Sequence, residues 1–141
     1  MRNKREPEKM LPLSPAVFHI LLALADGDKH GYGIMREVAE GTGGQMRMGP
    51  GTLYGSIKRM LEQGLIEEAE QRPDPELDDE RRRYYRLTDF GRKLVVAESR
   101  RLRQLVGIAQ GKRLLGSEKL ASGARLLRIV SGALYRGSQE S

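Results

Sequence analysis

The stretch GPGTLYGSIKRMLEQG, residues 49–64, has the pattern of a short amphipathic helix between glycines. Pro50 suits the first helical position, where its missing N–H costs nothing, and Gly64 suits the position just after the last turn. With about 100° of rotation per residue, the large apolar side chains share one face. They are Leu53, Ile57, Met60 and Leu61. We therefore predict a helix over residues 50–63 whose apolar face packs into a core.

The opposite face of this predicted helix is small, hydroxylated and cationic, mostly within the first two turns. It comprises Gly51, Thr52, Tyr54, Gly55, Lys58 and Arg59. Glycine lets a helix approach DNA closely, and the N-terminal end of a recognition helix meets base edges in the major groove. Basic side chains and helix N-terminal N–H groups suit phosphates, whereas hydroxyl groups suit phosphates or base edges. These residues are therefore predicted to contact double-stranded DNA.

The chain before this segment predicts a strongly apolar first helix. Ser14 and Pro15 provide an N-cap and a first helical residue, and Gly27 closes the helix. Its apolar residues cover nearly the whole circumference, so two different surfaces must bury it. One is expected to be the domain core and the other a second subunit.

A second, shorter helix is predicted from Tyr32 to about Glu40, and the glycine-rich run at residues 41–44 ends it. We expect Tyr32 to pack against the core. We expect His30 to hydrogen-bond the backbone at the turn that precedes the helix.

After Gly64 the pattern changes to strands. Residues 65–70 and 82–87 are expected to form a β-hairpin around a proline-containing loop, with Tyr84 or Tyr85 packing across to the first strand. Three helices followed by strand, loop and strand are the order of a winged helix-turn-helix. The expected fold is therefore mainly α with a small β-hairpin.

The second strand of this wing begins with three cations, Arg81, Arg82 and Arg83. They are predicted to reach a neighbouring phosphate or the minor groove of DNA. Alternate residues of a strand face opposite sides, so at most a subset of them contacts DNA. The acidic loop at residues 74–80 is expected to be a solvated tip or to pair with these arginines.

A long fourth helix is predicted from near Asp89, capped by Thr88. Its continuation is expected to weaken at Gly107, Gly111 and Gly116, and a last helix is expected from a Ser117 cap. The expected organisation is a flexible basic arm at residues 1–12, a winged helix-turn-helix at 13–87, a C-terminal helical dimerisation region at 88–136 and a tail at 137–141.

The composition limits the classes of function. The 141 residues suit one domain. The net charge of +6 is unevenly distributed, because residues 67–80 carry −7 and the rest of the chain therefore carries +13. A basic body favours a polyanionic partner. There is no cysteine, which excludes a disulfide, a thiolate nucleophile and a cysteine-based zinc site.

No targeting segment, cofactor or catalytic site is expected. The charged start is not followed by an apolar run, and the longest apolar stretch, residues 16–25, is about half of a membrane span, so the cytoplasm is the expected compartment. His19 and His30 are separated, which makes a metal site a poor interpretation. The glycine-rich residues 41–51 lack the Gly-Lys-Ser/Thr ending of a nucleotide loop. No arrangement of nucleophile and base suggests an enzyme.

Two other functions use the same fold. A winged helix also serves as a protein-interaction module without DNA binding, and an apolar outer face of the helix at residues 50–63 would favour that alternative. RNA binding is less favoured, because only Tyr54, Tyr84 and Tyr85 offer stacking surfaces.

Several short blocks, in this order and at these separations, resemble the PadR-like family of bacterial transcriptional regulators. The blocks are Asp26-Gly27, HGYGI at 30–34, GPGTLY at 49–54, GLI at 64–66, RRYYRLT at 82–88 and Gly91. The resemblance covers roughly Leu13 to Leu94. It implies DNA contacts at Thr52, Tyr54 and Lys58, with residues 49–51 shaping the start of the helix.

The resemblance also implies a winged-helix homodimer that represses a promoter at a palindromic operator and is released by a small molecule or another signal. Its subunits pair through the first helix and the C-terminal helices. The residues expected in this interface are Val17, Phe18, Leu21, Leu94, Leu102 and Leu105.

Overall fold

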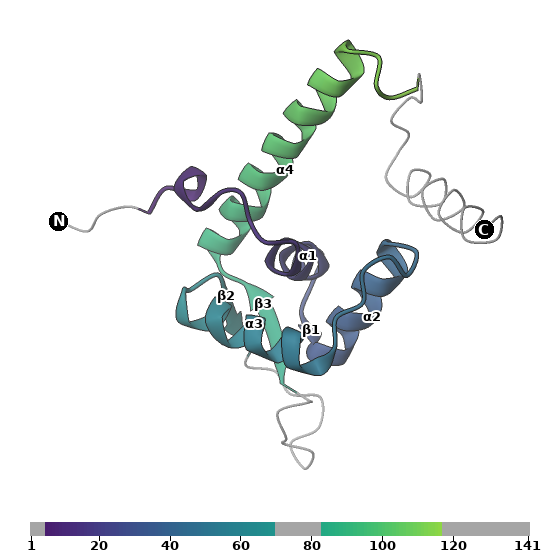
Figure 1. Ribbon diagram of the computed structural model, residues 1–141. Helices are drawn as coiled ribbons and strands as arrows, with labels where there is room; N and C mark the ends of the chain where they lie inside the picture. Colours follow the sequence, from purple (N-terminus) through teal and green to yellow (C-terminus); the bar gives the residue numbers. More distant parts are fainter. Residues whose placement is uncertain (1–4, 70–82, 117–141) are drawn as a thin grey trace.

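The computed structural model describes residues 5–69 and 83–116 and is mainly helical, with one small sheet (Figure 1). The element order is η1 (Pro7–Met10), α1 (Pro15–Leu24), β1 (Lys29–His30), α2 (Gly31–Gly41), α3 (Pro50–Glu62), β2 (Ile66–Glu68), β3 (Tyr84–Leu87) and α4 (Asp89–Gly111). The predicted winged-helix fold is confirmed. The expected helix from Ser117, the tail, the wing tip with Arg81 and Arg82, and residues 1–4 lie outside the described ranges.

The sheet has three antiparallel strands in the order β1-β3-β2. Ile66 pairs with Leu87 and Glu68 with Tyr85, so β2 and β3 form the predicted hairpin with strands shorter than expected. Tyr85 is buried among the core residues. The sequence did not predict β1, whose His30 pairs with Tyr84 and thereby joins the start of α2 to the wing.

The core surrounds α1, which contacts α2, α3 and α4. Large side chains from all four α-helices and from the region of the hairpin are fully or nearly fully buried. They include Ile20, Leu21, Leu24, Ile34, Leu53, Met60, Leu65 and Leu94. Each such side chain contributes roughly 1.5–3 kcal/mol by leaving water. This packing fixes the orientation of α3 relative to α1.

Three of the helices begin at side-chain caps. The Ser14 hydroxyl accepts the Val17 N–H at 3.3 Å, and His30 Nδ1 accepts the Gly33 N–H at 2.9 Å. The Thr88 hydroxyl accepts the Gly91 N–H at 3.0 Å and donates to the Gly64 carbonyl oxygen at 2.6 Å. The predicted caps at Ser14 and Thr88 and the predicted backbone bond of His30 are confirmed.

The segment expected to be a flexible arm differs from that expectation from Arg5 onward. Pro7–Met10 form η1, which packs against α4. The Arg5 guanidinium lies 4.0 Å from the centre of the Phe90 ring and donates to the Gln63 carbonyl oxygen at the end of α3. The Leu13 N–H donates to a Glu98 carboxylate oxygen at 2.7 Å. Aromatic, carbonyl and carboxylate partners therefore hold this segment in place.

Two expectations about helix faces are wrong. Tyr32 is 62% exposed, because Ile34 and Val38 occupy the core side of α2 and Tyr32 lies on another side of the helix. Leu61 is 37% exposed, because Ser56 completes the buried stripe of α3 in its place.

Of the glycines expected to weaken the continuation of α4, Gly107 does not interrupt the helix, which continues through it and ends at Gly111. A helical glycine costs only about 1 kcal/mol relative to alanine, which 23 residues of continuous helix absorb. No helix in the described ranges is long and apolar enough to cross a bilayer.

Candidate nucleic-acid interface

The outer face of α3 gathers most of the predicted DNA contacts on one surface. Gly51, Thr52, Lys58 and Arg59 are exposed, while Tyr54 and Gly55 are half-buried. Leu53, Ile57 and Met60 hold the opposite face in the core. The helix is thus anchored on one side and presents small and basic residues on the other.

The N-terminus of α3 has no side-chain cap. The N-cap residue is Gly49 and the first helical residue is Pro50, and no side chain accepts a hydrogen bond there. The other three long helices all have such an acceptor. The first N–H groups of an uncapped helix are unsatisfied donors at the positive end of the helix dipole, which favours an anion.

The two basic residues of α3 differ in their surroundings. Among the described residues, Lys58 has no ion pair or hydrogen bond through its side chain. The Arg59 guanidinium donates to the Ser56 hydroxyl at 3.4 Å and lies along the helix 3.8 Å from the position that a Cβ on Gly55 would take. A Cβ at position 55 would only make ordinary van der Waals contact with Arg59, so this glycine is not required by the position of the guanidinium.

Tyr54 serves a packing role that the sequence did not reveal. A Cβ on Gly31 would lie 2.6 Å from the Tyr54 hydroxyl oxygen and 2.9 Å from its Cζ. Gly31 is the buried first residue of α2. Tyr54 therefore joins the two helices of the helix-turn-helix.

Arg47 is a candidate contact that sequence reasoning missed. It lies in the connection between α2 and α3, is exposed, and has no ion pair in the described part of the chain. The Thr42 hydroxyl organises this connection, since it donates to the Val38 carbonyl oxygen at 2.8 Å and accepts the Met46 N–H at 3.0 Å. A lone cation in a glycine-rich turn just before the helix is the signal that points to it.

The described cations of the wing pair with acids of the same hairpin. Arg86 Nε lies 2.9 Å from a Glu67 carboxylate oxygen, and Arg83 Nε lies 3.6 Å from a Glu68 oxygen. Exposed pairs of this kind contribute only about 0–1 kcal/mol, so a phosphate competes with them at little cost. The structure thus places Arg83 beside Glu68, whereas Arg81 and Arg82 lie outside the described ranges.

The sequence matches the profile described as "Transcriptional regulator PadR-like family" over residues 20–97, more than half of the chain. The protein belongs to the PadR-like family. This match runs from the second half of α1 to the first part of α4 and therefore includes the entire described wing and α3.

The chain is also similar to individual proteins and to a solved structure. "Transcriptional regulator Rv3488" of Mycobacterium tuberculosis is 32% identical over 105 residues, which cover 74% of this chain and 87% of that protein. An uncharacterized 37.1 kDa protein in transposon TN4556 of Streptomyces fradiae is 38% identical over 88 residues, which are 62% of this chain but only 23% of that protein. The structure of a PadR family transcription regulator from Clostridium difficile R20291 matches with a TM-score of 0.58 and 25% identity, covering 73% of this chain and all of that one.

Some of the residues that we expected in the dimer interface of this PadR-like protein have no exposed side chain to offer a second subunit. Leu21 and Leu94 are fully buried in the core of the single chain, so they have no side-chain surface left for a partner, and we correct the expectation for them. Val17, Phe18 and Leu102 are half-buried, and Leu105 is 47% exposed.

Other apolar side chains are exposed on the same two helices of this PadR-like protein. The sequence did not single them out, because helical periodicity alone does not say which apolar face the core takes. They are Leu22, Val96, Val106 and Ile108.

Proposed function

We propose that this PadR-like regulator binds operator DNA through the first two turns of α3. The observation that carries the proposal is the uncapped N-terminus of α3, followed by an exposed Thr52 and a Lys58 that has no acid partner among the described residues. Backbone N–H groups and Lys58 neutralise phosphates, and Thr52 reads a base edge. The polar outer face of α3 favours DNA over a protein partner.

We further propose that two copies bind a palindromic operator and repress a promoter. Exposed Leu105, Val106 and Ile108 lie on the distal half of α4, where a second copy would remove them from water. A two-fold dimer presents its two α3 helices to half-sites that are roughly 34 Å apart, or a multiple of this spacing. A small-molecule effector that binds the state of low DNA affinity more tightly than the state of high DNA affinity releases the operator.

The test begins with selection of bound sequences from a random DNA pool. Lys58→Ala is then compared with Lys112→Ala, which removes the same charge from the far end of α4. We expect Lys58→Ala to weaken binding to all selected sequences and to lower the salt slope by about 1, while Lys112→Ala leaves both unchanged. A pool without any enriched sequence would favour a protein-interaction module and contradict the proposal.

Light scattering at micromolar concentration tests the dimer separately. We expect twice the mass of the chain for the unmodified protein. A monomer under these conditions would contradict the palindromic mode.

A further inference from the structure

A side chain that lies 58 residues earlier in the sequence closes the C-terminal end of α3. The backbone supplies part of this closure, because Gly64, at a φ of 71°, donates its N–H to the Leu61 carbonyl oxygen at 3.1 Å. The carbonyl oxygen of Gln63, the C-cap residue, accepts a hydrogen bond from the Arg5 guanidinium. This cation therefore lies at the negative end of the α3 dipole, where a positive charge is favourable.

The same guanidinium also contacts the start of α4. It lies 4.0 Å from the centre of the Phe90 ring, within the range of a cation–π contact. Phe90 is half-buried and packs against the core. A Cβ on Gly64 would lie 3.2 Å from the guanidinium, so the turn between the two elements is close to it as well. Arg5 therefore touches the end of α3, the turn after it and the first turn of α4.

Arg5 is held there by the segment that it begins, residues 5–13, which we call the N-terminal strap. Pro7–Met10 form η1, which packs against α4 (Figure 1). At the other end of the strap, the Leu13 N–H donates to a carboxylate oxygen of the buried Glu98 at 2.7 Å. The strap is thus attached to α4 at both of its ends.

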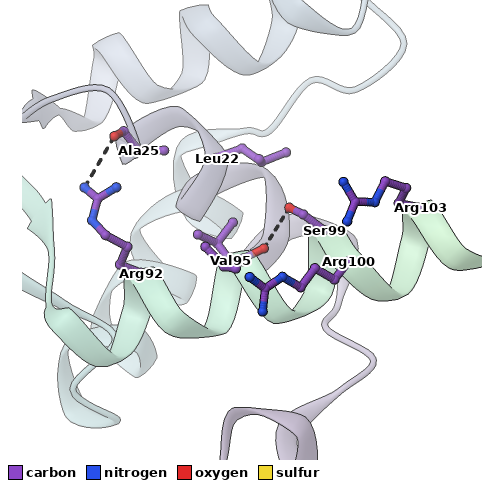
Figure 2. Close-up of a pocket in the computed structure, with 8 residues that line it drawn as sticks. Leu22, Ala25, Arg92, Val95, Ser99, Arg100 and Arg103 are labelled. Atoms are coloured by element: carbon purple, nitrogen blue, oxygen red, sulfur yellow. Dashed lines mark hydrogen bonds between the residues drawn. The ribbon is translucent and has the colours of Figure 1, made fainter. Parts of the chain in front are cut away.

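The helix that carries the strap is itself fixed to the core. Leu94 and Val95 of α4 are buried. Figure 2 shows the Arg92 side chain reaching from α4 to the end of α1, where it donates to the Ala25 carbonyl oxygen at 3.4 Å. The strap therefore connects the end of α3 to a helix whose direction is set by the core.

The last turn of α3 depends on contacts of this kind. The buried stripe of the helix ends at Met60, whereas residues 61–63 are exposed. The N-terminus of α3 has no side-chain cap. A buried stripe limits rotation of a helix about its own axis, and contacts at its ends limit its tilt. At the C-terminal end these contacts are made by Arg5 and by the Thr88 hydroxyl, which donates to the Gly64 carbonyl oxygen.

Arg5 lies far from the turns that are proposed to read DNA. Gln63 is about 16 Å from Thr52 along the helix axis, at a rise of about 1.5 Å per residue. Hydrogen bonds to base edges require a geometry held within about 0.5 Å and 10–20°, whereas charge interactions with phosphates vary more gradually with distance. A change in the tilt of α3 therefore affects the reading of bases more than the binding of phosphates.

We propose that Arg5 is a positioning residue for operator recognition. It fixes the tilt of α3 by joining the Gln63 carbonyl oxygen to the Phe90 ring, and the side chains of the first two turns depend on that tilt. This inference rests on the proposed function, in which α3 reads operator DNA. Loss of Arg5 then reduces the preference for operator over other DNA without removing a phosphate contact.

The test compares Arg5→Ala, Arg5→Lys and Lys9→Ala in the full chain. Lys9 lies in the same strap and its ion pair with Glu6 is exposed, so Lys9→Ala is the matched loss of one positive charge. Affinities for a selected operator and for a scrambled duplex of the same length are measured over a range of salt concentrations.

We expect Arg5→Ala to lower the ratio of operator affinity to scrambled-duplex affinity about ten-fold, as the loss of one base contact does. The salt slope should be unchanged, because no phosphate contact is lost. Arg5→Lys keeps the charge but not the planar donors, so its ratio should lie between those of Arg5→Ala and the unmodified protein. Lys9→Ala should match the unmodified protein.

Phe90→Leu tests the other partner of the guanidinium, since it keeps an apolar side chain but removes the ring. We expect a lower affinity ratio in Phe90→Leu, and a smaller further effect of Arg5→Ala when Phe90 is already leucine. Urea denaturation gives the folded fraction of each variant. A loss of folded protein alone lowers both affinities equally and leaves their ratio unchanged, so the ratio separates positioning from stability.

Two results would overturn the proposal. One is an affinity ratio of Arg5→Ala equal to that of Lys9→Ala. The other is a salt slope that falls by about 1 in Arg5→Ala, which would make Arg5 a phosphate contact.

Hydrogen exchange of the α3 amides, measured without DNA, separates this proposal from the proposed function. We expect the last turn of α3 to exchange several-fold faster in Arg5→Ala than in Lys9→Ala. Equal exchange in the two variants would overturn the role of Arg5 whether or not the protein binds DNA. Faster exchange in Arg5→Ala, together with no enriched sequence for the unmodified protein, would contradict the proposed function and not the contact of Arg5 with α3.

Discussion

The side chain of Tyr54 fills the space that a Cβ on Gly31 would need, with the hydroxyl oxygen 2.6 Å and the Cζ 2.9 Å from that position. Gly31→Ala therefore forces the Tyr54 ring away from the start of α2. We expect the free energy of unfolding to fall by about 1–3 kcal/mol, as in other overpacked sites. Tyr54→Leu shortens the opposing side chain, so Gly31→Ala should lower the free energy of unfolding by less when Tyr54 is already leucine. Urea denaturation of the unmodified protein, the two single variants and the double variant measures these changes. If Gly31→Ala lowers the free energy of unfolding equally with Tyr54 and with leucine at position 54, the contact is refuted.

The first turn of α4 makes a still closer approach to the chain leaving α3. A Cβ on Gly91 would lie 1.9 Å from the Leu65 carbonyl oxygen, which is a backbone atom and cannot rotate away. We expect Gly91→Ala to destabilise the protein by about 3 kcal/mol or more. Gly107→Ala, in the same helix with no neighbour within 4 Å, should instead raise stability by about 1 kcal/mol. Thermal unfolding compares the two, and the same sign for both would be inconsistent with this packing.

Glu98 gives the protein a pH-dependent attachment between the N-terminal segment and α4. The hydrogen bond from Arg101, followed by that from the Leu13 N–H, outweighs burial and lowers the pKa of the Glu98 carboxyl below its ordinary 4.5. Because the folded protein favours the charged form, the stabilisation is fully present above pH 4.5 and is lost as pH falls below it through the folded pKa.

The variant Glu98→Gln isolates this attachment. At about pH 7 we expect it to be less stable than the unmodified protein by roughly 1–3 kcal/mol, since it loses bonds to a charged acceptor. The difference between the two should shrink as the solution is acidified below about pH 4. Denaturation curves across this range measure it, and a difference that does not change with pH would show that the carboxylate charge is irrelevant.

Arg47 and Thr52 are expected to play different parts in DNA binding. Arg47→Ala removes a phosphate contact and should weaken binding to all selected operators alike, lowering the salt slope by about 1. Thr52→Val keeps the shape but removes the hydroxyl, and should change which base is preferred, at a cost of about 1–3 kcal/mol for the original operator. Anisotropy titrations on a panel of operator variants separate the two, and an altered base preference for Arg47→Ala would reverse these assignments.

The sequence predicted the elements that long periodic patterns define. The apolar stripe of α3 apart from Leu61, the Ser14 and Thr88 caps and the hairpin all depend on local spacing, and the structure confirms them. It did not predict β1, because two residues carry no periodicity and Lys29–His30 become a strand only by pairing with β3.

The remaining differences concern contacts between elements distant in the chain. The choice between Leu61 and Ser56 for the core depends on how α3 is rotated against α1. The packing of Arg5 on Phe90 and Gln63 joins residues far apart in the sequence. Likewise, the position of Tyr54 beside Gly31 depends on the angle between α2 and α3, which no single helix encodes.

Thr88 joins the turn after α3 to the first turn of α4 through a single hydroxyl group. With 23 residues, α4 is roughly 34 Å long, and its first half is packed in the core through Gly91, Leu94 and Val95. A difference of about 5° in the direction of a helix of this length displaces its far end by about 3 Å. In a two-fold dimer joined along such helices, a small change in their crossing angle becomes a change in the separation of the two recognition helices, so the spacing of operator half-sites is the quantity to which this architecture is most sensitive.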